Sequence, residues 1–91
     1  MEYTTDLLEI LNNIDPSLLD YQEWCNVGMA LKYEGYTASD WDYWSQRDSK
    51  RYHKNECYRK WESFTGSGVT GGTIVQYAKN QGWVPPMINR E

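Results

Sequence analysis

The sequence predicts an all-α fold, a compact bundle of about five short helices around an aromatic-rich core. Apolar residues recur at helical spacing in several segments, and no stretch alternates between apolar and polar residues for long enough to form a strand. A chain of 91 residues buries only about 60–65% of its surface on folding, so its core needs large side chains. Five Trp, eight Tyr and one Phe supply them.

The first helix is expected over about residues 5–13, with Thr4 or Thr5 as its N-cap. It ends before Asp15, because a residue that precedes proline is pushed out of helical geometry. The apolar face of this helix comprises Leu7, Leu8, Leu11 and Ile14.

The second helix begins after Asp20, because Asp20 and Glu23 form a D-x-x-E variant of the capping box. Gly28 interrupts its apolar face, and a helical glycine is costly unless another element packs closely against it. We therefore expect an aromatic side chain to cross this helix at Gly28. Gly35 is a natural left-handed residue just beyond the helix end. The apolar positions are Tyr21, Trp24, Val27, Gly28 and Leu31.

Two shorter helices follow, over residues 39–46 and about 54–63, and the polar segment 47–53 connects them. Ser39 is the expected N-cap of the first, since its hydroxyl can accept a hydrogen bond from the opening turn. Residues that face the core recur three or four positions apart on both helices. They are Trp41 and Trp44 on the first helix and Cys57, Trp61 and Phe64 on the second.

A flexible loop over residues 65–69 leads to a fifth helix, expected over about 71–81 with Thr70 as its N-cap. Gly82 ends this helix, and Trp83 is placed to fold back onto the last turn, as in a Schellman cap. The side that faces the bundle comprises Ile74, Tyr77, Ala78 and Gln81.

Residues 1–83 are expected to form one domain, and residues 84–91 a linker or tail. Cys25 and Cys57 each lie on a helix face beside a tryptophan, where a free thiol acts as a small apolar side chain. A disulfide or a zinc site is a weaker alternative, since no C-x-x-C or H-x-x-x-H pair is present. No cofactor is expected. The expected core comprises Trp24, Val27, Gly28, Leu31, Trp41, Trp44, Cys57, Trp61, Phe64, Ile74, Ala78 and Trp83.

The net charge of −4 hides an uneven distribution. Residues 1–46 carry nine acidic residues and one lysine, whereas residues 47–60 carry six basic and two acidic residues. The acidity of the whole chain argues against strong nonspecific nucleic-acid binding, but the basic block can contact phosphates. The alternative is that Tyr52 packs inward and the lysines are merely solvated. The candidate contact residues are Arg47, Lys50, Arg51, Tyr52, His53, Lys54, Arg59 and Lys60.

The sequence offers few groups for catalysis, and no catalytic residue is expected. His53 is the only histidine, and the carboxylates fall mostly on helix surfaces or at helix caps. The glycine-rich segment 66–73 lacks the G-K-[ST] ending of a P-loop, although the N–H groups of residues 71–73 could hold an anion. No apolar run is long enough to span a membrane and nothing resembles a signal peptide, so we expect a cytoplasmic location without membrane contact.

Seven short motifs occur in order between residues 15 and 83. They are Tyr21-x-x-Trp24, Val27-Gly28-Met29-Ala30-Leu31, Trp41-x-x-Trp44-Ser45, Lys50-x-Tyr52, Glu56-Cys57-x-x-x-Trp61-x-Ser63-Phe64, Val69-Thr70-x-Gly72-Thr73-Ile74 and Ala78-Lys79-x-x-Gly82-Trp83. In this order they resemble the primase C-terminal domain family of the second type, a small helical module in replication proteins of phages, plasmids and integrated elements. Two positions depart from that family: Arg51 lies between Lys50 and Tyr52, and Gly71 stands where an aliphatic residue is more usual.

The resemblance implies a part of an enzyme. Such modules accompany a primase-polymerase catalytic domain and often a helicase-type ATPase, which would be partners within the same parent chain. We therefore expect a non-catalytic accessory domain in DNA replication that helps a mobile-element primase hold single-stranded DNA or a nucleotide through the basic block. The alternative is a structural connector that docks these domains, or protomers of a ring, through the acidic residues 1–46. A duplex-reading helix-turn-helix fits poorly.

Overall fold

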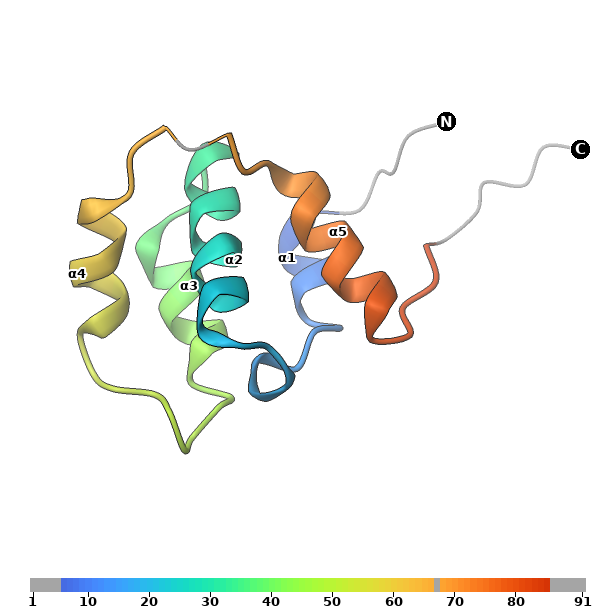
Figure 1. Cartoon of the computed structure of the whole chain (residues 1–91), viewed down its shortest axis with the longest axis horizontal. Coiled ribbons are helices and arrows are strands. Elements are labelled where there is room, and N and C mark those ends of the chain that lie inside the picture. The colour runs from blue at the N-terminus through green and yellow to red at the C-terminus, as the bar shows by residue number, and fades with distance from the viewer. Residues whose placement is uncertain (1–5, 67, 86–91) are drawn as a thin grey trace, which may run out of the picture.

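The computed structural model describes residues 6–66 and 68–85. Over these residues the chain forms five α-helices, one short 3₁₀-helix and no strand, which confirms the predicted all-α fold (Figure 1). The elements in chain order are α1 (Leu7–Leu11), η1 (Pro16–Leu18), α2 (Tyr21–Tyr33), α3 (Ala38–Ser45), α4 (Glu56–Ser63) and α5 (Gly71–Asn80). Of the expected tail 84–91, residues 86–91 lie outside the described part of the chain.

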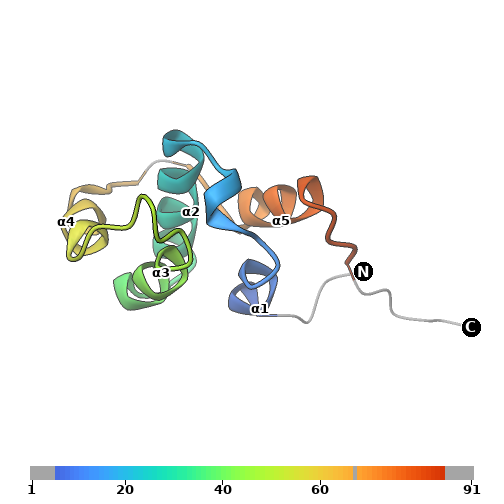
Figure 2. The same cartoon turned by 90° about the horizontal axis from the view of Figure 1, so that it is seen from below.

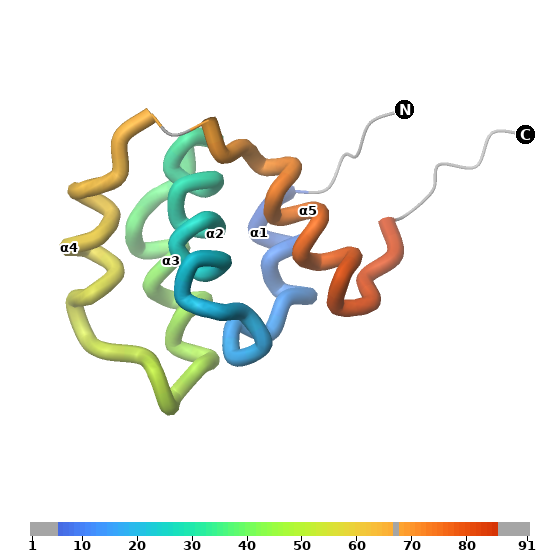
Figure 3. The backbone as a smooth tube through the Cα atoms, in the orientation of Figure 1, coloured from blue at the N-terminus to red at the C-terminus, as the bar shows by residue number. Residues whose placement is uncertain are grey.

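Helix α2 lies in the middle of the bundle (Figures 1 and 3). It contacts α3, α4 and α5, while α1 packs against α5 and α3 against α4. The first and last helices of the chain therefore lie side by side, as the view from below also shows (Figure 2). This arrangement leaves the connection between α3 and α4, which carries the basic block, on the side of α2 away from α5 (Figure 1).

Both ends of α2 are closed as the sequence predicts. Asp20 Oδ1 accepts a hydrogen bond from the Glu23 N–H at 2.8 Å, and Glu23 Oε1 accepts one from the Asp20 N–H at 2.9 Å, which completes the capping box. At the other end Gly35 has a φ of +91°. The Tyr36 N–H then donates to the Leu31 carbonyl at 2.9 Å, which is the long hydrogen bond of a Schellman motif.

Gly28 is a point where a side chain of α3 packs directly on the backbone of α2. A Cβ atom built on Gly28 would stand 2.6 Å from Trp41 Cε2 and 2.9 Å from Phe64 Cε2, far inside van der Waals contact. Only a residue without a side chain leaves room for the indole ring here. The prediction that an aromatic side chain crosses α2 at Gly28 is therefore confirmed, and Trp41 is the side chain concerned.

Trp41 is the centre of an aromatic cluster that joins three helices. Its ring stacks on that of Trp24 with centroids 4.5 Å apart, and it lies 5.4 Å from the ring of Phe64 and 6.1 Å from that of Trp61. Such offset and tilted pairs are the arrangements that aromatic quadrupoles favour. Trp41 is fully buried, and its Nε1 has no hydrogen-bond partner among the described residues.

The residues expected in the core all pack in it, though not to the same depth. Trp24, Phe64 and Trp83 are half-buried and lie against the core, and the other expected members are buried. Cys25 and Cys57 are buried free thiols. The core also contains residues that the expected set leaves out, namely Ile10, Leu11, Ile14, Leu19 and Ala30.

The N-terminal part of the fold departs from expectation in two ways. The N-cap of α1 is Asp6, whose side chain accepts the Leu8 N–H, whereas Thr4 and Thr5 lie outside the described residues. The 3₁₀-helix η1 was not predicted. Pro16 does end the preceding segment, but it also occupies the first position of η1, where its fixed φ suits a new helical turn.

Two later helices begin at other residues than expected. Helix α3 begins at Ala38, because Thr37 and not Ser39 is its N-cap, and Thr37 forms a capping box with Asp40. Helix α4 begins at Glu56 and not near residue 54, since the residue before it, Asn55, has a φ of +72° and cannot belong to a right-handed helix.

Candidate nucleic-acid interface

The basic connection between α3 and α4 is fastened to the body of the domain at its first residue. Arg47 Nη1 donates to the Asn12 carbonyl at 2.9 Å, and Arg47 Nη2 donates to Asn12 Oδ1 at 2.8 Å. Asn12 is the C-cap of α1, where free carbonyls attract a cation. The guanidinium of Arg47 thus ties α3 to α1, although the side chain remains exposed.

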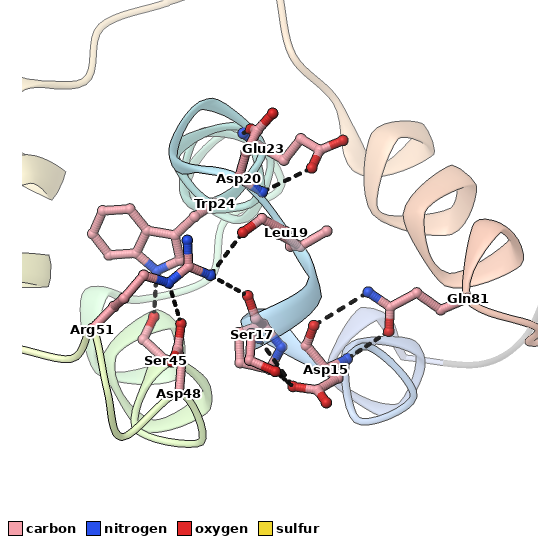
Figure 4. A network of polar contacts seen from close by, with 11 residues as sticks. Asp15, Ser17, Leu19, Asp20, Glu23, Trp24, Ser45, Asp48, Arg51 and Gln81 are labelled. Carbon is pink, nitrogen blue, oxygen red and sulfur yellow. Dashed lines mark hydrogen bonds and ion pairs between the residues drawn. The ribbon is translucent and has the colours of Figure 1, made fainter.

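Arg51 fastens the same connection to η1. Its Nη2 donates to the carbonyls of Pro16 at 2.9 Å and Leu19 at 2.7 Å, and its Nε lies 2.6 Å from Asp48 Oδ2 (Figure 4). Asp48 is buried, with 9% of its surface exposed. The guanidinium therefore satisfies two backbone acceptors and one buried carboxylate at once, and much of its hydrogen-bonding capacity is used within the domain.

Tyr52 also points inward, which agrees with the alternative that this ring packs against the domain. Its hydroxyl donates to Asp42 Oδ1 at 2.8 Å, and Gln46 Nε2 donates to Asp42 Oδ2 at 3.0 Å. Asp42 is buried. The hydrogen bond to Asp42, and secondarily desolvation, raises the pKa of Tyr52 to about 12. Tyr52 is therefore a neutral donor at physiological pH.

The remaining basic candidates behave differently. Four exposed side chains make no hydrogen bond or ion pair with any described residue, and we call them the basic surface: Lys50, His53, Lys54 and Arg59. The ammonium of Lys60 stands 5.0 Å from the ring centroid of Tyr21, and hydrogen bonding to Tyr21 raises the pKa of Lys60. The basic candidates thus fall into two groups. Arg47 and Arg51 bond within the domain, whereas the residues of the basic surface are exposed to solvent.

Many acidic residues of the first half are used inside the domain. Four aspartates are helix N-caps or capping-box partners, and a fifth, Asp42, is buried and hydrogen-bonded. Hydrogen bonds from Tyr36 and from the Leu8 N–H lower the pKa of Asp6. The four capping aspartates are Asp6, Asp15, Asp20 and Asp40.

The N-terminus of α5 already holds an anion that belongs to the chain. Glu34 Oε2 accepts the Gly71 N–H at 2.8 Å, so that a carboxylate from the end of α2 lies at the positive end of α5. A Cβ on Gly71 would stand 2.9 Å from Leu7 Cδ1 and 3.2 Å from Glu34 Oε2. Glycine at this position therefore allows the Glu34 carboxylate and Leu7 to approach the start of α5 closely.

A small pocket lies beside Arg51, between η1, α2, α3 and the start of α4. Its floor includes Ser45 and Cys57, both buried, and Trp24 and Tyr52 contribute aromatic walls. Trp24 Nε1 donates to Ser45 Oγ at 2.8 Å (Figure 4). Burial raises the pKa of Cys57 to about 11, which keeps its sulfur protonated and unreactive. The sequence analysis missed this pocket because its residues come from four separate segments.

Neither a cluster of metal-binding side chains nor a membrane-spanning helix is found among the described residues. No group of three or more His, Cys, Asp or Glu side chains is placed there to hold a metal ion. Nor is any helix of the described part long and apolar enough to cross a membrane.

Comparison with known proteins gives one match. The family described as Primase C terminal 2 (PriCT-2) matches residues 7–78, which include all five α-helices apart from the last two residues of α5. No curated protein and no solved structure matched the chain.

Proposed function

The chain belongs to the primase C-terminal 2 (PriCT-2) family, and on that basis we propose that it is a non-catalytic accessory domain of a phage or mobile-element DNA primase. In this role it holds the single-stranded template, or the initiating nucleotide, during primer synthesis. The catalytic and helicase-type domains of the same parent chain are its proposed neighbours.

The free cations of the basic surface carry this proposal. Arg47 and Arg51 hold the domain together, but Lys50, Lys54 and Arg59 are exposed and unpaired among the described residues, and His53 lies between the lysines. Single strands are bound by cationic surfaces that neutralise phosphates and by rings on which bases stack. The net charge of −4 limits nonspecific binding, so contact is confined to this block.

The surroundings of the reactive groups support a non-catalytic role. The Cys57 thiol is buried with a raised pKa, and the Cys25 thiol is buried too. Asp42 and Asp48 are engaged by Tyr52 and Arg51.

The alternative role, a connector that docks the parent domains through acidic residues, has less support. It needs negative side chains that are free on the surface. Four of the aspartates in residues 1–46 instead satisfy helix N-termini, Asp42 is buried, and Glu34 caps α5. Co-purification with the separately expressed parent domains distinguishes this role from template binding.

Fluorescence anisotropy with a labelled single-stranded oligonucleotide tests the proposal. Lys50→Glu and Lys54→Glu each remove one free cation, and we expect each to weaken binding and to lower the slope of log K against log salt by about 1. Lys79→Glu is the matched control, because it makes the same change of charge on an exposed residue of α5, across α2 from the basic surface. Equal affinities of all three variants and the wild type would rule out the proposed surface.

A further inference from the structure

The pocket beside Arg51 adjoins the basic surface. Lys50 directly precedes Arg51, and Lys54 lies two residues before Glu56. Each of these free lysines is therefore close along the chain to a residue that lines the pocket. Consecutive Cα atoms are about 3.8 Å apart, so the backbone of each lysine lies within about 8 Å of a residue that lines the pocket. A phosphate held by either lysine would therefore stand close to the pocket.

The walls of the pocket suit a flat aromatic ligand. Tyr21, Trp24 and Tyr52 line it, and most of its surface is apolar. One face of the Trp24 ring stacks on Trp41 with centroids 4.5 Å apart, and Trp41 does not line the pocket, so the pocket meets the part of the Trp24 ring that Trp41 leaves uncovered. Tyr21 is 53% exposed, and its ring is tilted by 47° to that of Trp24 with centroids 5.7 Å apart, so the two rings contact each other. A base in the pocket would therefore stack against one of these rings and meet the edge of the other.

The polar groups of the pocket complement the edge of a base. Asp48 Oδ1 accepts no hydrogen bond within the described chain, although Asp48 is nine-tenths buried, and the half-buried Glu56 carboxylate accepts none either. Arg51 keeps a further donor, since Nη1 has no partner among the described residues. Every nucleobase carries amino or imide N–H groups beside carbonyl or ring-nitrogen acceptors. The Asp48 and Glu56 carboxylates can accept hydrogen bonds from such N–H groups, and Arg51 Nη1 can donate one to such an acceptor.

From these observations we infer that the pocket binds one unpaired nucleobase, whose phosphates lie on the adjacent lysines. The inference rests on the proposed function and assigns it a base-binding site. The base comes either from the template strand or from a free deoxynucleoside triphosphate, and both present the same ring and phosphate.

Two strands of equal length test the inference with the whole chain. One is a fluorescein-labelled oligodeoxynucleotide, and the other carries abasic sugar-phosphates in place of every nucleotide, so both offer the same phosphates. Loss of the bases is expected to weaken binding to the wild type about tenfold. Tyr21→Ala removes an exposed wall of the pocket at the first position of α2, where alanine is well tolerated, and should abolish most of that difference. Tyr43→Ala, which removes a ring that is 77% exposed and outside the pocket, should preserve it.

Tryptophan fluorescence during titration with a deoxynucleoside triphosphate identifies the source of the base. A saturable change in fluorescence that Tyr21→Ala removes would support the inference, with a free nucleotide as the ligand. A base dependence of strand binding that Tyr21→Ala removes would support it with the template strand as the ligand. Equal affinity for the two strands without a nucleotide response overturns the pocket but leaves phosphate binding by the basic surface in place. A base dependence that Tyr21→Ala does not change also overturns it. Failure of both strands to bind, without a nucleotide response, overturns the pocket and the proposed function together.

Discussion

At the scale of single residues, Gly28 leaves no room for a side chain. Alanine is a better helix former than glycine by about 1 kcal/mol, but its Cβ would stand 2.6 Å from Trp41 at this site. Trp41 is held between Trp24 and Phe64 and cannot move aside cheaply. Because overpacking outweighs propensity here, we expect Gly28→Ala to lower the free energy of unfolding by about 1–3 kcal/mol in urea denaturation.

Gly72 provides the matched control for this substitution. It is also a helical glycine, but a Cβ there would meet only Thr70 Oγ1, at 3.5 Å, which is ordinary contact. Gly72→Ala should therefore leave the free energy of unfolding unchanged or raise it by up to about 1 kcal/mol. An equal loss of stability in both variants would mean that the Trp41 crossing is not the cause.

Tyr52 gives the domain a dependence on alkaline pH. Its pKa is about 12 in the folded state against 10.0 ordinarily, so the folded state holds this proton more tightly than the unfolded chain. The resulting stabilisation is complete below pH 10 and is lost as the pH rises to 12. Wild type should therefore exceed Tyr52→Phe in stability at pH 8, and the difference should shrink between pH 10 and 12 in denaturation experiments at each pH. Tyr43→Phe, which removes a hydroxyl from an exposed ring, is the matched control.

Single residues differ in how far the sequence predicts their roles. Asp20, Glu23 and Gly28 were assigned correctly, because a capping box and a glycine in an apolar helix face are local signals. Thr37 was missed, although Thr37 and Asp40 have the spacing of a capping box. The part that Arg51 plays in fastening the connection to η1 was not predictable, since the two carbonyls it binds lie 35 and 32 residues away along the chain.

At the scale of elements, Glu34 links the end of α2 to the start of α5. Its carboxylate satisfies the Gly71 N–H and lies at the positive end of the α5 dipole. We expect Glu34→Ala to lower the free energy of unfolding by about 0.5–1.5 kcal/mol. Glu62→Ala should not destabilise the domain, because Glu62 is exposed near the C-terminal end of α4 and makes no hydrogen bond within the described chain. Chemical denaturation monitored by circular dichroism compares them, and equal effects would exclude a special role for Glu34.

The presence of each α-helix was predictable from the sequence, whereas the first residue of several helices and the existence of η1 were not. Hydrophobic periodicity reports which segments are helical, and that signal is clearest in α4 and α5. Helix starts depend on which of several adjacent polar side chains bonds the first turn. In η1 only three residues are involved, too few for a periodic pattern, so Pro16 signalled an end and not a beginning. The candidate pocket is formed by contacts between elements, so no local sequence pattern predicts it.

At the scale of the whole molecule, the two sides of α2 are joined into one unit. Helix α1 has five residues and would not be helical alone, so it depends on packing against α5. Ile14, just after it, accepts the Trp44 Nε1–H at 3.0 Å through its carbonyl, which links this region to α3. A substitution that destabilises α1 should therefore also lower the stability reported by the tryptophans on the other side of α2.

Leu11→Ala tests this coupling. Leu11 is 2% exposed, and its truncation should cost about 2–5 kcal/mol. Tryptophan fluorescence and far-ultraviolet circular dichroism should report one common, lowered transition, as for a two-state domain. Leu18→Ala, at a side chain that is 68% exposed, should change stability by less than about 0.5 kcal/mol. If fluorescence kept the wild-type midpoint while circular dichroism shifted, the halves would unfold independently.

The fastening of the basic connection has a consequence for the thermodynamics of association. Arg47, Arg51 and Tyr52 fix the segment to α1, η1 and α3 before any strand arrives. The entropy of ordering this backbone is lost during folding, so under the proposed function a bound single strand would meet a preformed surface on which mainly side chains such as those of Lys50 and Lys54 remain to be ordered. Calorimetry of strand binding should accordingly show little of the heat-capacity change that accompanies coupled folding.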